Sequence, residues 1–457
     1  MSTSASVSLA VALRDAVRGA VAVPGDPRYD TARSPFHLAA EQRPAAVVEP
    51  VDAEDVAGAL RVARAHRLAV TAQATGHGAT GLGGDTLLVR TTAMRGIEID
   101  EQARTARVEP GVRWGDLHAL TAPLGLHGVC GTAPGVSITG YCLGGGISWF
   151  ARKYGYGANS VLAVELVTAD GEQVRVTDEA DPELMRALRG GTGAYGIVTA
   201  LEIQLYHAPE VFGGQVMWLG ERGAEVLRAY RDWVQTVPEE LTSVVTLFRV
   251  PPVPDAPEFL HNQWVVWVGL AYLGDADMGR ELVCPLLDAV DEPLLNELGP
   301  VGIDELGRIA KEPVDPIPSH YHAELLRELD DRTLEDLLRF GGPDSASPLL
   351  FVMLRHLGGA LGRPGPVPSA CSHVDADFMV HALGAPLGGP EHDAAIRAIL
   401  PAFADTLDGR GTGRVPLTFL APGESLDRVF GDGELARLRA VKERVDPDGV
   451  VRANHRL

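Results

Sequence analysis

Residues 75–81 read Thr75-Gly76-His77-Gly78-Ala79-Thr80-Gly81, and glycines 76, 78 and 81 match the GxGxxG spacing of dinucleotide-binding turns. In a Rossmann fold that turn opens a helix, and the helix N-terminus holds the pyrophosphate. Here Leu82-Gly83-Gly84-Asp85 follows instead, and a strand-like stretch comes next at 86–90. The stretch therefore indicates a nucleotide-binding turn outside the Rossmann class.

Two further glycine-rich segments follow this turn. One ends Thr139-Gly140-Tyr141-Cys142-Leu143-Gly144-Gly145-Gly146, and the other reads Gly190-Gly191-Thr192-Gly193-Ala194-Tyr195-Gly196. Backbone N–H groups of neighbouring glycines can approach a phosphate closely, because no side chain stands in the way. Three such patches, spread from residue 75 to residue 196, indicate one extended phosphate-bearing ligand.

The segments around these patches mix helices and strands without a regular βαβ alternation. Asp52 is typical of a helix N-cap, and Val56, Leu60 and Ala63 repeat behind it at helical spacing. We expect strands at 68–74, 86–90, 96–99, 106–108, 161–168, 173–177, 196–206 and 263–270, and helices at 114–124, 323–339 and 434–445. This mixture predicts an α+β fold.

Composition excludes several classes of protein. A chain of 457 residues predicts more than one domain, and a net charge of −21 disfavours nucleic acid and anionic membranes as partners. The 4 cysteines show no CxxC spacing, so we expect neither a disulfide framework nor a metal site. No basic residue precedes the apolar stretch at 7–13, which predicts that no signal peptide is present and that the protein is cytoplasmic.

The order and spacing of the motifs resemble those of the vanillyl-alcohol-oxidase superfamily with its PCMH-type FAD-binding domain, and within it the berberine-bridge-enzyme-like (BBE-like) oxidases. The matching motifs, in chain order, are Ala74-Thr75-Gly76-His77, Gly144–Gly146, Arg152-Lys153-Tyr154-Gly155, Asn159, Ala169-Asp170-Gly171, Gly193–Thr199, Lys442, Asp446-Pro447 and Asn454. Together they run through most of the sequence.

This resemblance implies a two-part FAD-binding domain, made of residues 1–210 (with a PCMH-type core at about 43–210) and 416–457. An α+β substrate domain with an antiparallel sheet, at 211–415, would lie between them. It also implies FAD bonded through its 8α-methyl group to His77. The other positions expected at the cofactor are Gln73, Ala74, Thr75, Gly76, Gly78, Gly131, Thr132, Val136, Ser137, Gly140, Gly144, Gly145, Gly146, Gly196, Ile197, Val198 and Asn454.

Some members of the family carry a second flavin bond, from a cysteine. An ungapped comparison places Ala133 at that position, with Cys130 three residues earlier, so we expect a single bond and leave a bond from Cys130 open. Val136 takes the place of the residue that controls oxygen access in the family. Its small side chain resembles that of the oxygen-reactive members.

The catalytic base departs from the family pattern. Pro416 and Thr418 stand where family oxidases often carry the tyrosine and asparagine of a late strand. The segment Arg355–Ala360 resembles a family strand end, for which we expect a structural role. The remaining candidates for a base are Tyr141, His320, Tyr321, His322, Asp375 and Asp377.

The function expected from the resemblance is oxidation of a small organic substrate, a sugar or a secondary-metabolite alcohol or amine. The substrate would give a hydride to FAD, and molecular oxygen would reoxidise the cofactor. Two alternatives stay open, namely a flavin-bearing enzyme with non-redox, cyclase-like chemistry and a flavin-binding protein without catalysis.

Overall fold

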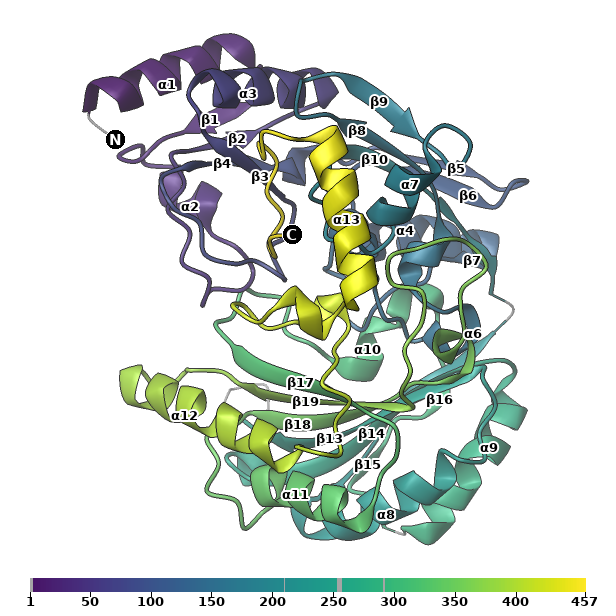
Figure 1. Cartoon of the computed structure of the whole chain (residues 1–457). Coiled ribbons are helices and arrows are strands. Elements are labelled where there is room, and N and C mark those ends of the chain that lie inside the picture. Colours follow the sequence, from purple (N-terminus) through teal and green to yellow (C-terminus); the bar gives the residue numbers. More distant parts are fainter. Residues whose placement is uncertain (1–2, 209, 253–256, 291) are drawn as a thin grey trace.

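The computed structural model describes residues 3–208, 210–252, 257–290 and 292–457. Its first sheet, in the order β1-β2-β4-β3, begins with an antiparallel pair and continues with parallel strands. The strands are β1 (Ala20–Ala22), β2 (Ala46–Glu49), β3 (Ala69–Gln73) and β4 (Thr86–Arg90). Helices α1 (Thr3–Ala16) and α3 (Ala53–Ala65) pack together beside this sheet (Figure 1). The Asp52 carboxylate accepts a hydrogen bond from the Asp55 N–H, which confirms the predicted N-cap.

The second sheet is antiparallel throughout, in the order β5-β6-β10-β8-β9. Its strands are β5 (Ile97–Asp100), β6 (Thr105–Val108), β8 (Val161–Val167), β9 (Gln173–Val176) and β10 (Ile197–Gln204). Between β6 and β10 lie α4 (Trp114–Thr121), β7 (Leu126–His127), α5 (Ile138–Leu143), α6 (Ala151–Tyr154) and α7 (Pro182–Leu188), and β7 pairs with β11 (Tyr206–His207). Pairing of β8 with β9 confirms the predicted hairpin.

The third sheet is the largest, and its strands are antiparallel in the order β15-β12-β14-β13-β18-β19-β17, with β16 beside β12. The strands are β12 (Val211–Leu219), β13 (Leu241–Arg249), β14 (Trp264–Leu273), β15 (Leu295–Asn296), β16 (Gly299–Pro300), β17 (His320–Leu326), β18 (Phe351–His356) and β19 (Phe378–Gly384). Four helices cover the face that is turned away from the first two sheets (Figure 1). They are α8 (Gly223–Trp233), α9 (Ala276–Ala289), α11 (Asp331–Gly341) and α12 (Pro390–Thr406).

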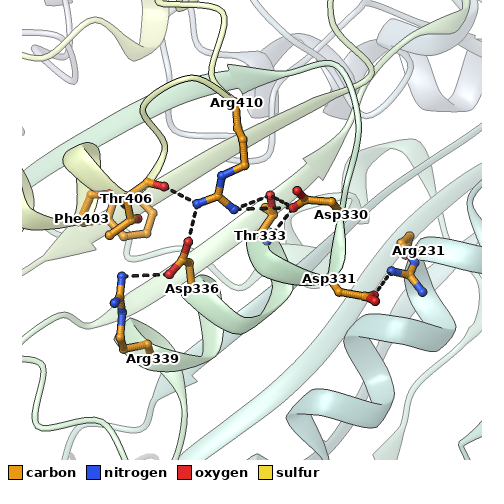
Figure 2. Close-up of polar contacts among 9 residues, drawn as sticks. All are labelled: Arg231, Asp330, Asp331, Thr333, Asp336, Arg339, Phe403, Thr406 and Arg410. Atoms are coloured by element: carbon orange, nitrogen blue, oxygen red, sulfur yellow. Dashed lines mark hydrogen bonds and ion pairs between the residues drawn. The ribbon is translucent and has the colours of Figure 1, made fainter.

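Polar contacts tie this helical layer together (Figure 2). Arg410, in the loop after α12, donates to the Thr333 hydroxyl at 2.9 Å and also to the Asp336 carboxylate, and both partners belong to α11. Arg339 approaches the same carboxylate from the exposed side, at 2.8 Å. The loop that leaves α12 is therefore fixed to the neighbouring helix.

The predicted helix at 323–339 is wrong in its first part. Residues 320–326 form β17, which pairs along its whole length with β19, from His320 opposite Gly384 to Leu326 opposite Phe378. The helix begins only at Asp331, because the Asp330 carboxylate accepts the Thr333 N–H and so caps its first turn. A short apolar run such as Ala323-Glu324-Leu325-Leu326 fits either periodicity, and pairing with a neighbouring strand decided between them.

The C-terminal segment returns to the first sheet. Helix α13 (Asp432–Val445) contacts α7, and Val451 then forms a parallel bridge with Val70 of β3. The Asp446 carboxylate accepts the backbone N–H groups of Val450 and Val451 at 2.9 and 2.8 Å and so fixes the turn between them. The domain boundaries at 210 and 415 stay predictions. Among the residues that the structure describes, no helix combines the length and the apolar character needed to cross a membrane.

Candidate active site

The loop that carries His77 leaves the end of β3 and lies against residues 35–37. Gly76 has a φ of +78°, and a Cβ atom there would lie 2.8 Å from the Cβ of Pro35, so this turn requires glycine. The N–H of Phe36 donates to the Thr75 carbonyl at 3.0 Å, and the Phe36 ring stacks on the His77 imidazole with 3.8 Å between centroids. The imidazole is therefore held in one orientation by an aromatic ring.

One ring nitrogen of His77, Nδ1, has a hydrogen-bond partner. Its Nδ1 lies 2.9 Å from the Thr75 hydroxyl. Burial, aided by the positive charge of Arg113, lowers the pKa of His77 to about 4. The imidazole is consequently neutral at pH 7, and a neutral imidazole keeps an electron pair for bonding to an electrophilic carbon.

The second glycine-rich segment wraps around Tyr141. Gly146 has a φ of +75°, and a Cβ atom there would lie 2.2 Å from Cε1 of the tyrosine ring. A Cβ at Gly157 would lie 2.6 Å from the same ring atom, and the edge of the Trp114 indole packs at 5.4 Å between centroids. Burial raises the pKa of Tyr141 well above its usual value. Tyr141 is thus an enclosed residue, and a role for its hydroxyl as a base stays a prediction.

The structure brings the three glycine-rich patches and the C-terminal segment together. A Cβ atom at Gly190 would lie 3.4 Å from the Cα of Gly145, which joins the third patch to the second. The Asn454 amide donates to the Gly78 carbonyl at 2.6 Å, which joins the C-terminal segment to the His77 loop. The Lys442 ammonium group links these two contacts, because it donates to the Ala194 carbonyl of the third patch at 2.7 Å and to the Val451 carbonyl of the C-terminal segment at 2.6 Å. Segments that are far apart in the chain therefore come together, as the extended-ligand hypothesis requires.

Unsatisfied polar atoms occur within these patches. The Gln73 Nε2, Thr139 Oγ1 and Thr192 Oγ1 atoms are buried and have no hydrogen-bond partner among the described residues. These groups are available to donate to the acceptor oxygens of a bound ligand. Together with the glycine backbone, this donor set fits a pyrophosphate-bearing nucleotide such as FAD. By contrast, the Ser137 hydroxyl already donates to the Pro110 carbonyl at 2.8 Å.

The other cofactor positions lie around the same patches. The structure shows no contact that decides their roles, which stay predictions. Ala74, Thr75, Gly76 and Gly78 belong to the His77 loop, Gly131, Thr132, Val136, Gly140 and Gly144 to the second patch, and Gly196, Ile197 and Val198 to the start of β10.

The three candidates on β17 are divided between its two faces. The His320 Nε2 lies 2.7 Å from the Asp393 carboxylate of α12, and the His322 ring packs on Phe403 of the same helix. Tyr321 points to the opposite face, where its ring meets His381 with 5.4 Å between centroids. Of the three, only Tyr321 therefore lies on the side of the glycine-rich patches.

Neither aspartate candidate joins this group. Asp375 is exposed and pairs with Arg327 at 2.7 Å. Asp377 follows it in the loop before β19, and its carbonyl accepts the Leu357 N–H at 2.7 Å. Within the described ranges, no cluster of histidine, cysteine, aspartate or glutamate side chains could hold a metal ion.

The expected late strand around Pro416 is a helical turn instead. Residues Leu417–Phe419 form a short 3-10 helix, and Pro416 precedes it as the N-cap with extended backbone. A proline has no N–H group to donate to a sheet, which disfavours a strand here. A Cβ atom at Gly144 would lie 2.9 Å from Cγ2 of Thr418, so this turn packs directly on the second patch. Residues 416–419 therefore lie beside the second patch, but as a helical turn and not as a strand.

Two polar residues on the large sheet were missed by the sequence analysis. Arg355 was expected to be structural, and His381 was not considered. Each interrupts an otherwise apolar strand, in Phe351-Val352-Met353-Leu354-Arg355 and in Phe378-Met379-Val380-His381-Ala382. A polar residue in a buried strand is the signal that could have found them.

Comparisons with known proteins match part of the sequence to a domain family and the fold to solved structures. The FAD binding domain family matches residues 44–177. This chain contains an FAD-binding domain. BBE-like 1 from Physcomitrella patens has the same fold, with a TM-score of 0.85 at 20% identity over 98% of both chains. A second solved structure, 6-hydroxy-D-nicotine oxidase from Arthrobacter nicotinovorans, matches with a TM-score of 0.80 at 24% identity over 95% of this chain and 96% of that one. The predicted α+β fold is confirmed, and it is the fold of a BBE-like protein.

Curated relatives match over part of their length. (R)-6-hydroxynicotine oxidase from Paenarthrobacter nicotinovorans is 34% identical over 207 residues, which are 44% of this chain and 45% of that protein. Glucooligosaccharide oxidase from Sarocladium strictum is 29% identical over 223 residues, 47% of this chain and 44% of that protein. The matched region thus spans less than half of each of these relatives.

Proposed function

We propose that this chain is an FAD-dependent oxidase that carries its FAD bonded to His77 and oxidises a small organic substrate. When bound, FAD would accept a hydride from a C–H bond of the substrate, and molecular oxygen would act as the final electron acceptor. The names of the relatives support this proposal, because hydroxynicotine oxidase and glucooligosaccharide oxidase are both oxidases of small organic molecules. A cytoplasmic location stays a prediction.

The observation that carries the proposal is the state of His77. Its neutral imidazole is stacked on Phe36 at 3.8 Å, and its loop accepts a hydrogen bond from Asn454 of the C-terminal segment at the Gly78 carbonyl. A histidine that is protonated at pH 7 could not form a bond through a ring nitrogen without first losing a proton. Burial lowers the pKa of His77 from 6.5 to about 4, so practically all of the imidazole is neutral at pH 7 instead of most of it.

A single covalent bond is the form that we propose. Burial raises the pKa of the Cys130 thiol to about 12, so this group is protonated at pH 7. The thiolate is the nucleophilic form of cysteine, and an inert thiol at this position argues against a second bond. Ala133, at the position of the family cysteine, has no group to offer.

The experiment is acid precipitation of the purified protein, followed by absorbance of the pellet and the supernatant. Yellow colour should stay in the pellet for the unchanged protein and move to the supernatant for His77→Ala. The matched control is His392→Ala, because this residue lies on α12, on the face of the large sheet that is turned away from the first two sheets. Free flavin in the supernatant of the unchanged protein would contradict the covalent bond.

The oxidase assignment has its own test. Photoreduced protein mixed with oxygenated buffer should reoxidise rapidly, and Val136→Leu should slow this reaction because the larger side chain narrows the path of oxygen. Reduced flavin that persists for many minutes in air would instead indicate a dehydrogenase. Bleaching of the flavin by a panel of sugars, alcohols and amines separates a redox enzyme from a cyclase-like enzyme or a flavin-binding protein, in which the flavin would stay oxidised.

A further inference from the structure

Two polar side chains lie on the face of the large sheet that is turned toward the FAD-binding part. Strand register places Met353 opposite His381 and Arg355 opposite Met379, so all four side chains share one face of β18 and β19. Met353 and Met379 belong to the same buried cluster as Trp114 and Tyr141 of the FAD-binding part. Arg355 and His381 therefore face the glycine-rich patches across the interior of the molecule.

Arg355 is buried, and two of its guanidinium nitrogen atoms lack a hydrogen-bond partner among the described residues. The residue is 3% exposed, and neither its Nε nor its Nη1 atom has a hydrogen-bond partner in the part of the chain that the structure describes. Its guanidinium lies 5.7 Å from the centroid of the Phe419 ring. The negative charge of Glu312 acts on this guanidinium, yet the Nε and Nη1 donors stay unsatisfied. An arginine stays charged even in such surroundings, and buried donors without acceptors are unfavourable.

A second buried arginine, Arg152, has the hydrogen bonds that are typical of a structural role. Arg152 is 7% exposed, and its guanidinium donates to the Leu241 carbonyl at 2.9 Å, to the Leu357 carbonyl and to the His356 ring at 2.7 Å. Its donors are thus satisfied from within the protein. The contrast indicates that Arg355 is built to meet a group that comes from outside the chain.

His381 lies beside this arginine in an aromatic setting. Its ring centroid is 5.4 Å from that of Tyr321, 5.3 Å from that of Phe351 and 5.5 Å from that of Phe419. Its Nε2 atom is buried and has no partner among the described residues. Burial, helped by the charges of Arg355 and His322, lowers the pKa of His381 to about 3, so the ring is neutral at pH 7 and can accept a hydrogen bond.

We propose that Arg355 binds an anionic group of the substrate and that His381 accepts a hydrogen bond from its hydroxyl or amine group. The inference rests on the proposed function and names its substrate class, a small planar carboxylic acid. The aromatic rings and methionines on this face offer flat apolar walls, which suit an aromatic molecule. A neutral sugar would bring no anionic group to the unsatisfied donors of the guanidinium.

The test titrates the oxidised, flavin-loaded protein with benzoate while the flavin absorption spectrum is recorded. Benzoate should perturb the spectrum saturably, and Arg355→Met should weaken its binding about 10- to 100-fold through loss of charged hydrogen bonds. Arg355→Lys should restore part of the affinity, because it returns the charge without the fork geometry. Arg397→Met is the matched control, since that arginine lies on α12 with its side chain 60% exposed and should leave binding unchanged.

Thermal melting separates binding from a structural role. If Arg355 serves a ligand, Arg355→Met should melt at the same temperature or higher without benzoate, because an unpaired buried charge is removed. A clear fall in melting temperature would show a structural arginine and overturn the proposal. Unchanged benzoate binding together with a lower flavin reduction potential would overturn it as well, since the guanidinium would then serve the flavin.

Hydroxybenzoates test His381. At least one of the three positional isomers should bind about threefold to tenfold tighter than benzoate through the added hydrogen bond, and His381→Leu should abolish that difference. Three isomers no tighter than benzoate would overturn the assignment to His381. A protein without flavin absorption would contradict the proposed function itself, whereas a flavin spectrum that benzoate leaves unchanged contradicts only this inference.

Discussion

Substitution of Gly146 by alanine tests how tightly the second glycine-rich segment is built around Tyr141. The backbone at Gly146 is left-handed, with a φ of +75°, and the added Cβ would lie 2.2 Å from the tyrosine ring. Any residue other than glycine loses about 1–2 kcal/mol in this conformation. Overpacking of a filled core costs a further 1–3 kcal/mol or so.

The ring cannot move aside to relieve the contact. A Cβ atom at Gly131 would already lie 3.0 Å from the opposite edge of the Tyr141 ring, and Trp114 closes another side at 5.4 Å between centroids. The two costs therefore add to about 2–5 kcal/mol, which for a large domain corresponds to a fall in melting temperature of roughly 5–15 °C. Thermal unfolding followed by circular dichroism measures this shift.

A double-mutant cycle identifies the cause. In a Tyr141→Leu background the clash is reduced and only the backbone strain remains, so Gly146→Ala should cost at least about 1 kcal/mol less there. Gly433→Ala is the control, because no atom lies within 4 Å of the added Cβ and its φ is not positive. The reasoning fails if Gly146→Ala melts with the control, or if its cost is the same in both backgrounds.

Two further predictions concern acid stability and the helical layer. Burial lowers the pKa of His118 from 6.5 to about 3, so the unfolded chain binds a proton that the folded chain does not, and stability falls as pH drops below 6.5. Between pH 7 and pH 5 the stability lost through His118 amounts to about 2 kcal/mol. Melting curves at both pH values should show a smaller loss of stability for His118→Gln than for the unchanged protein, whereas the exposed control His373→Gln should show the full loss. Equal losses in all three proteins would refute the assignment to His118. Arg410→Met should lower the melting temperature through a loss of about 1–3 kcal/mol, because it removes partly buried charged hydrogen bonds to α11. Arg339→Met, on the exposed side of the same Asp336 carboxylate, should change the melting temperature little. Equal effects of the two arginine substitutions would contradict the difference in burial.

Capping residues, turn residues and hydrophobic periodicity predicted the helices and strands whose ends are set by neighbouring residues in the chain. The Asp52 cap, the strand 86–90 and the hairpin around Asp170 are all observed where turn and cap residues indicated them. The glycine-rich patches were recognised for a similar reason, because residues with positive φ leave a mark in the sequence. The family resemblance supplied the order of the domains.

These local signals could not predict contacts between strands that are distant in the sequence. Strand β17 was taken for the start of a helix, because only its pairing with β19 distinguishes the two. The division of Tyr321 from its neighbours His320 and His322 follows from the same pairing. His381 and Arg355 meet through the register of β18 and β19, which no sequence motif records. Candidate catalytic residues on a sheet face are thus the hardest part of such a site to predict.

The return of the C-terminal segment to the first sheet has a consequence for how the protein is made. The carbonyl of Gly78 receives its hydrogen bond from Asn454, 376 positions later in the chain, and Val70 is paired with Val451. During synthesis the His77 loop emerges early, and it stays without these partners while the whole large sheet is being produced. We therefore expect the nascent chain to bind FAD late, only after residues 446–454 have left the ribosome and reached the His77 loop and the first sheet.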